Sequence, residues 1–124
     1  MKTYRDNGNG TVTDNVTGLM WQQEDDNIER TWEEALTYCE GLTLAGNSGW
    51  RLPNIKELRS IVDNTKDNGP SIDTTYFPNT NSSRYWSSTT NVQNQTSGAW
   101  LVSFSAGGFS STFKSSDEHV RCVR

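Results

Sequence analysis

Three polar residues near the N-terminus have the types and the spacing that could hold a calcium ion. Asp6, Asn9 and Asp14 lie in a glycine-containing stretch, and turns rich in side-chain oxygen atoms resemble parts of a calcium-binding loop. The EF-hand pattern fails, because it requires a glutamate at its twelfth position, and Thr17 stands there when counting starts at Asp6. We therefore interpret the stretch as a turn built on Asn-Gly chemistry and expect no bound metal or cofactor.

Few side chains in the chain could perform acid–base or nucleophilic catalysis. His119 is the only histidine, so neither a Ser-His-Asp triad nor a zinc site can be assembled around it. We expect His119 to have an exposed or partly packed structural role. Asp25, Asp26 and Glu29 precede a predicted helix, where we interpret them as a solvated run of negative charge. The sequence therefore predicts a protein that is not an enzyme.

Cys39 and Cys122 are the only cysteines, and they could form a disulfide bond or remain two buried free thiols. In the chain-entropy model, a disulfide that closes so long a loop stabilises the folded state by about 4–5 kcal/mol. A disulfide would indicate an oxidising compartment, whereas free thiols would fit a cytosolic protein and reopen redox chemistry. The spacing of the two residues leaves both alternatives open.

Amides and hydroxyls in the C-terminal third form the candidate recognition surface. The segment from Asn91 to Ser97 carries several amides at a predicted loop tip, and Ser110, Thr112 and Lys114 alternate along a predicted strand. Such groups suit neutral, hydrogen-bonding ligands, such as glycans or the loops of a partner protein, and they equally suit a solvated loop. The predicted ligand-binding residues are Arg84, Tyr85, Asn91, Gln93, Asn94, Gln95, Ser97, Ser110, Thr112 and Lys114.

The strands that must position these residues are predicted from alternation in residues 85–124. Trp100, Val102 and Phe104 share one side of a half-buried antiparallel strand, and a more polar set shares the other. The Gly107-Gly108 pair predicts a hairpin turn, because glycine adopts positive φ without steric cost. The next strand places two phenylalanines on the face opposite the candidate hydroxyls. We expect three or four consecutive strands here.

The first predicted helix begins at a capping box. The Thr31 hydroxyl is expected to accept from the third helical amide, and Glu34 to reach back to the amide of the cap. Four apolar residues then recur at helical spacing, which places Cys39 on the inward face of the last turn. Gly41 is expected to end the helix.

A second capping box, formed by Asn54 and Glu57, predicts another helix that ends near Asn64. Its buried stripe is predicted to contain Ile55, Leu58, Ile61 and Val62. Before both helices, the turn-rich residues 4–22 predict a small hairpin or meander. After them, residues 63–83 show little periodicity, and such a long irregular stretch in a compact domain is usually functional or packed as a loop.

Length and composition set the class of protein. The 124 residues suffice for one domain, and the five tryptophans are interpreted as core residues because only 31% of the chain is hydrophobic. A net charge of −4 argues against nucleic acid and anionic membranes as partners. No apolar run is long enough to insert in a membrane, and no signal peptide is recognisable. We expect residues 1–124 to be a single domain excised from a larger protein.

A series of motifs, in order along nearly the whole chain, resembles one known family. These motifs resemble the C-terminal domain of the Lcl-type collagen-like adhesins, a family long catalogued as a domain of unknown function. The motifs are Thr17-Gly18-Leu19-Met20-Trp21-Gln22, Thr31-Trp32-Glu33-Glu34-Ala35-Leu36, Trp50-Arg51-Leu52-Pro53, Tyr85-Trp86-Ser87-Ser88-Thr89 and Val120-Arg121-Cys122-Val123-Arg124.

The resemblance implies an α+β, C-type lectin-like fold, with two helices, a small mostly antiparallel sheet and long loops. In that fold a disulfide typically joins the end of the first helix to the last strand, so the resemblance implies a bond between Cys39 and Cys122. It also implies a recognition or adhesion module that binds a glycan or protein ligand on a bacterial surface or secreted protein. The expected location is extracellular or in the cell envelope.

The family's association with sulfated glycosaminoglycans is not expected here, because that ligand needs clustered Lys and Arg and this chain is acidic. The triplets that bind sugar through calcium in C-type lectins are also missing. Two alternatives to the adhesion module stand beside it. One is the ligand-binding variable domain of a diversity-generating retroelement, with variable positions in residues 91–97 and 110–116. The other is a structural or trimerising domain, since an oligomer could form through the parent protein.

Overall fold

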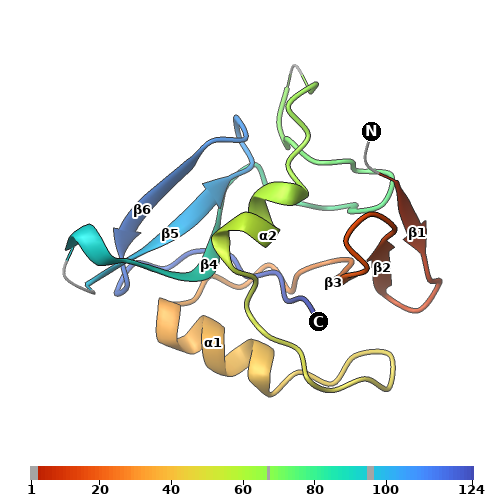
Figure 1. Ribbon diagram of the computed structural model, residues 1–124, viewed down its shortest axis with the longest axis horizontal. Helices are drawn as coiled ribbons and strands as arrows, with labels where there is room; N and C mark the ends of the chain where they lie inside the picture. Colours follow the sequence, from red (N-terminus) through yellow and green to blue (C-terminus); the bar gives the residue numbers. More distant parts are fainter. Residues whose placement is uncertain (1–2, 67, 95–96) are drawn as a thin grey trace.

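The computed structural model describes residues 3–66, 68–94 and 97–124 of the chain. Figure 1 shows two small sheets at opposite ends of the molecule, with the two helices and the C-terminal segment between and below them. This arrangement is of the predicted α+β class. The elements are β1 (Tyr4–Asp6), β2 (Thr11–Asp14), β3 (Met20–Gln22), α1 (Trp32–Glu40), α2 (Ile55–Ser60), β4 (Arg84–Asn91), the 3-10 helix η1 (Val92–Asn94), β5 (Gly98–Ser103) and β6 (Phe109–Phe113).

The N-terminal sheet is an antiparallel meander in the order β1-β2-β3, as the turn signals predict. Its connections are closed by short polar side chains. Asp6 Oδ1 accepts a hydrogen bond from the backbone N–H of Gly8 at 2.9 Å, and Asp14 Oδ1 accepts from that of Val16 at 2.8 Å. Asn9 accepts from the backbone two residues on in the same way. The interpretation of these three residues as turn formers is confirmed.

The C-terminal sheet has the order β4-β5-β6, and its middle strand is buried on both faces. The neighbouring residues Leu101 and Val102 are both 0% exposed. Leu101 lies in a hydrophobic cluster with Ala35 and Cys39 of α1, whereas Val102 lies in a second cluster with Leu58 of α2. The prediction of a half-buried strand is therefore wrong, because a helix covers each face of β5.

The predicted hairpin turn between β5 and β6 is confirmed. The backbone N–H of Ser103 donates to the carbonyl of Gly108 at 2.8 Å, and Gly107 has a φ of 81°. A second constraint also favours glycine, since a Cβ atom at Gly107 would lie 2.7 Å from Oδ1 of Asn64. The turn thus packs closely against the segment that follows α2.

Both capping boxes are confirmed. The Thr31 hydroxyl accepts from the Glu34 backbone N–H, and the Asn54 side chain accepts from the Glu57 backbone N–H. Gly41 ends α1 as predicted.

The second helix, α2, ends at Ser60, four residues before the predicted end. The amides of Ile61 and Val62 donate to the carbonyls three residues earlier. The amide of Asp63 donates to the carbonyl of Ser71, which lies outside the helix. The predicted buried stripe nevertheless faces the core, with Leu58 and Ile61 buried and the other two residues half-buried.

The C-terminal segment, residues 118–124, joins the two sheets and is not the fourth strand that the alternation allows. His119 forms a parallel bridge with β4, in which its carbonyl accepts from the Trp86 amide at 3.0 Å. Further along, the amides of Met20 and Gln22 in β3 donate to carbonyls of the segment at 2.8 and 3.0 Å. Figure 1 shows this segment passing from the C-terminal sheet toward the N-terminal one.

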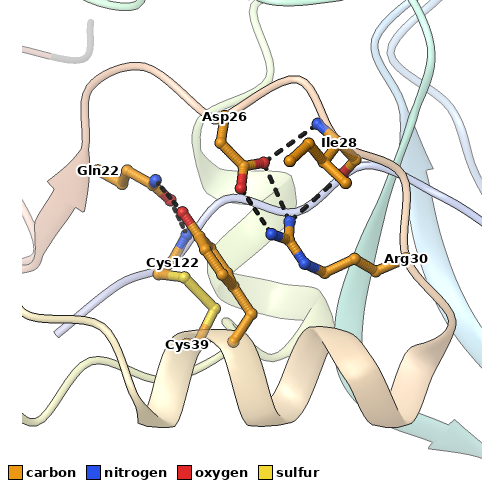
Figure 2. Close-up of a disulfide and its surroundings, with 7 residues drawn as sticks. Gln22, Asp26, Ile28, Arg30, Cys39 and Cys122 are labelled. Carbon is orange, nitrogen blue, oxygen red and sulfur yellow. Dashed lines mark hydrogen bonds and ion pairs between the residues drawn. A yellow bond between two sulfur atoms is a disulfide. The ribbon is translucent and has the colours of Figure 1, made fainter.

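A disulfide bond between Cys39 and Cys122 fastens α1 to the C-terminal segment, as the family resemblance implies. The Cα atoms are 5.5 Å apart, and both side chains are buried. Figure 2 shows the neighbouring Gln22, whose Oε1 accepts from the Cys122 amide at 2.9 Å. The bond excludes the alternative of two free thiols, and with it the redox chemistry that such thiols would allow. It spans 83 residues, so in the chain-entropy model it contributes about 4–5 kcal/mol.

Candidate functional site

The predicted recognition residues of β6 and its neighbours divide between the two faces of the C-terminal sheet. Ser110 pairs with Leu101 and Thr112 pairs with Ala99, so both hydroxyls belong to the face that α1 covers. Lys114, on the same side, places its Nζ 4.0 Å above the Trp32 ring and donates to the Thr90 hydroxyl. The predicted polar face therefore packs partly against α1. Ser110 is its exposed member.

Tyr85 does not lie on the surface. Its side chain is 0% exposed, and its hydroxyl donates to Asp25 Oδ2 at 2.8 Å. Arg84 is exposed, but its guanidinium forms an ion pair with Glu118 at 2.6 Å. The expectation that these two residues flank a binding surface together is wrong for Tyr85, because a buried ring cannot contact a ligand.

One predicted ligand-binding residue of the amide-rich loop is engaged in hydrogen bonds within the domain. Asn91 is buried, and its Nδ2 donates to the Ser111 hydroxyl at 2.8 Å while its Oδ1 accepts from the Gln93 amide. Gln93 and Ser97 are exposed. The carbonyl of Ser97 accepts a hydrogen bond from the backbone amide of Lys114, the residue that follows β6. Asn94 ends η1, and Gln95 lies outside the described residues.

The other face of the sheet carries exposed apolar side chains that the sequence does not single out. Phe109 is 48% exposed, Phe113 is 65% exposed, and Val92 of η1 is 78% exposed. The half-buried Trp100 ring lies 5.6 Å from that of Phe109. The alternation correctly predicts that the phenylalanines share a face, but β6 is an edge strand and α2 does not extend over it.

Unpaired positive charge borders these rings. The Arg59 guanidinium lies 4.0 Å above the Phe109 ring, and Arg59 lines a cavity of about 330 Å³ with Lys56, Asn64 and Gly107. Within residues 3–66, 68–94 and 97–124, Lys56 and Arg59 have no carboxylate at ion-pair distance. We call Lys56, Arg59, Val92, Trp100, Phe109 and Phe113 the aromatic surface.

The match to a protein family covers this surface and the scaffold that carries it. The family model described as the Lcl C-terminal domain matches residues 10–124. The chain belongs to the Lcl C-terminal domain family. The range includes both helices, the disulfide bond, the whole C-terminal sheet and the C-terminal segment, so the resemblance drawn from the motifs is confirmed. A search of curated proteins finds no match.

This Lcl C-terminal domain also contains a buried polar cluster that the sequence does not reveal. The Asp25 side chain, which is 3% exposed, lies 3.8 Å from Nδ1 of His119 and accepts from the Tyr85 hydroxyl. Asp25 is therefore not solvated, although its neighbour Asp26 remains exposed and pairs with Arg30. His119 is buried, which goes beyond the partly packed role predicted for it.

Arg121 lies fully buried beside this cluster. Its guanidinium donates to the carbonyls of Gln22 and Gln23 at 3.0 and 2.7 Å and to the Thr80 hydroxyl at 2.9 Å. Burial lowers the pKa of Arg121 and raises the pKa of Tyr85, in each case by disfavouring the charged form. These contacts fasten two loops to the C-terminal segment, so the cluster has a structural explanation.

The described residues were also compared with the requirements of a metal site and of a membrane-spanning helix. Over the part of the chain that the structure describes, no group of three or more His, Cys, Asp or Glu side chains is arranged to hold a metal ion. The helices of the same residues are also too short or too polar to cross a membrane.

Proposed function

We propose that this domain is a non-enzymatic recognition module of an adhesin-like surface protein and that it binds a glycan at the aromatic surface. The observation that carries the proposal is the group of exposed rings beside two unpaired cations. Single exposed apolar residues are common in proteins, but rings that gather on an ordered sheet usually mark an interaction site. Aromatic faces stack on sugar rings, and the Lys56 and Arg59 side chains supply hydrogen-bond donors at the border.

The scaffold supports the proposal because it holds the strands that carry the rings in place and leaves the rings exposed. The middle strand of the sheet is buried on both faces, and the disulfide bond fixes α1 beneath it. Two helices, small sheets and a bond from the first helix to the C-terminal segment are what a C-type lectin-like fold would have, and we propose that fold. The disulfide bond also supports an extracellular or cell-envelope location.

A second candidate function is self-association, which the exposed edge favours. Among the described residues, β6 pairs only with β5, and Val92 and Phe113 beside it are exposed, so a second copy could cover them. Sedimentation of the isolated domain tests this candidate, since a strict monomer would contradict it. The retroelement hypothesis stays a prediction, for which a near-copy of the C-terminal coding stretch beside a reverse transcriptase gene would be the evidence.

A glycan array, probed with and without a chelator, tests the glycan proposal. We expect binding that survives the chelator, because none of the proposed contacts is a metal ligand. The double variant Phe109→Ala/Phe113→Ala should lose the signal. The matched control is Val16→Ala/Ile28→Ala, which removes two exposed apolar side chains far along the chain from the aromatic surface and should keep it. An array without hits, or equal signals from both variants, would overturn the proposal.

A further inference from the structure

We propose that a second site, which borders the aromatic surface at Val62 and Asn64, binds the basic side chain of a lysine or arginine in a partner peptide. The site is a cavity of about 440 Å³ between β1 and the segment that follows α2. Figure 1 shows the chain rising from the end of α2 into a loop, after which it runs toward β1. Its lining combines an apolar wall with two carboxylates, Asp63 and Asp73. The proposal does not depend on glycan binding.

The apolar wall of the cavity is rigid. Tyr4 and Ile61 are 9% and 1% exposed, and Val62 lines the cavity beside them. The Tyr4 ring packs at 5.4 Å from the Tyr76 ring and edge-on at 5.2 Å from the Phe77 ring. Long basic side chains place their methylene groups along apolar surface and keep the charged end at a polar rim. This wall therefore fits the stem of such a side chain.

The carboxylates supply the opposite charge. Neither Asp63 nor Asp73 has a basic side chain at ion-pair distance among the described residues. Each carboxylate accepts from a backbone amide two residues on, at 2.9 Å in Asp63 and 3.0 Å in Asp73, so both are held in place by the chain itself. A cation entering the cavity would meet two carboxylates without an ion pair among the described residues, although the charge of Lys66 acts on Asp63 from a greater distance.

The Tyr4 hydroxyl adds a hydrogen-bonding group to the cavity beside the two carboxylates. Its residue is nine-tenths buried and lines the cavity, yet the hydroxyl makes no hydrogen bond to any described residue. Burial and the carboxylates of Asp14, Asp73 and Asp63 raise the pKa of Tyr4, so the phenol stays neutral and can accept an N–H from an ammonium or guanidinium group.

A peptide fits the rim better than a free polyamine. The exposed Asn64 lines the cavity, and its carboxamide forms no hydrogen bond within the described residues, so it can pair with the amide of a peptide backbone. A polyamine offers only amines. The net charge of −4 also favours a basic partner through long-range attraction. The ligand class is therefore a peptide that presents one basic side chain.

Calorimetric titration with N-acetyl-lysine methylamide and its arginine counterpart tests this site, with N-acetyl-norleucine methylamide as the uncharged analogue. We expect the basic compounds to bind and the norleucine compound to bind at least about tenfold more weakly, because it cannot form charge-assisted hydrogen bonds with the carboxylates. Equal binding of the three compounds would overturn the proposal. Binding of spermidine without binding of the amino-acid amides would overturn the assignment to a peptide.

Two isosteric variants locate the binding. Asp63→Asn/Asp73→Asn keeps the oxygen atoms that accept from the Thr65 and Thr75 amides and removes only charge, so the fold should persist. We expect at least about tenfold weaker binding of the basic compounds. Glu33→Gln/Glu34→Gln, which removes the same charge on α1, is the matched control and should change the affinity less than twofold. Equal losses in both variants would contradict the site. Glycan binding should be unaffected, which separates this test from that of the aromatic surface.

Discussion

The two faces of the C-terminal sheet differ in how far their side chains are already engaged. On the α1 face, the indole N–H groups of Trp32 and Trp86 donate to backbone carbonyls at 2.9 and 2.8 Å, and Lys114 stacks on a ring. On the α2 face, the rings of Phe109 and Phe113 extend beyond the helix and remain exposed. The sheet thus serves as core on its α1 side, whereas its α2 side is core beneath the helix and open at the edge strand β6. The difference predicts that substitutions on the α1 face change stability, whereas those on the aromatic surface change binding.

The largest effect on the α1 face should come from the disulfide bond. We expect the variant Cys39→Ala/Cys122→Ala to lose about 4 kcal/mol of unfolding free energy, because the unfolded chain regains the freedom of an 83-residue loop. Urea unfolding of the variant beside oxidised and reduced wild-type protein measures the loss. A variant as stable as the oxidised protein would show that the bond contributes nothing to this face.

Single substitutions to alanine, one on each face of the sheet, compare the contributions of the two faces to stability. Leu101→Ala should cost about 2–5 kcal/mol, because Leu101 is fully buried against α1. Phe113→Ala should stay within about 0.5 kcal/mol, because its ring is mostly solvated. Denaturant titration of both variants provides the measurement. Similar losses at the two positions would mean that the phenylalanine belongs to the core.

Substitutions at the two helix caps should have effects of intermediate size. Both should lower stability, but only one should also weaken binding. Thr31→Ala and Asn54→Ala each remove a side-chain acceptor for a backbone N–H, so each should cost about 1 kcal/mol. Only Asn54→Ala should also weaken glycan binding, because α2 carries Lys56 and Arg59. Unfolding curves and array signals of the pair test this expectation. It fails if Thr31→Ala weakens binding to the same degree.

The smallest expected effect is a loss of stability in acid. The hydrogen bond and charge of Arg30 lower the pKa of Asp26 from its ordinary value of 3.8. A lowered pKa in the folded state stabilises the fold above the unfolded pKa, and that contribution disappears as the pH falls through the folded pKa. The pair is partly exposed, so we expect less than about 1 kcal/mol. Asp26→Asn should flatten this part of the stability–pH curve measured from pH 6 to pH 2, and a curve as steep as that of the wild type would contradict this expectation.

Local features of the fold could be predicted from the sequence because their partners are close in the chain. The capping boxes at Thr31 and Asn54 and the turns at Asp6 and Asp14 depend on residues two or three positions away. The disulfide bond follows from the family resemblance, since the spacing of the two cysteines left a pair of free thiols equally open. The family itself was identified from short motifs and is confirmed.

The parts that escaped prediction depend on distant segments. Alternation cannot show that helices cover both faces of β5, so the strand was expected to be half-buried. The Tyr85 ring packs against Phe104 in the core, and Asp25, which lies 60 positions away in the chain, accepts from its hydroxyl. The exposure of Phe113 follows from the edge position of β6, which depends on the sheet order. The residues placed at the candidate site therefore changed, while the strands that carry it did not.

The central claim is that the residues buried under α1 determine stability, whereas the exposed aromatic surface at β6 determines binding. The most direct test measures the dissociation constant of the best glycan from the array for wild type, Leu101→Ala and Phe109→Ala/Phe113→Ala, with the unfolding free energy of each. We predict wild-type affinity for the folded fraction of Leu101→Ala, despite its lower stability. The double phenylalanine variant should bind at least about tenfold more weakly at nearly unchanged stability. The opposite pattern, or parallel losses in both variants, would contradict the account.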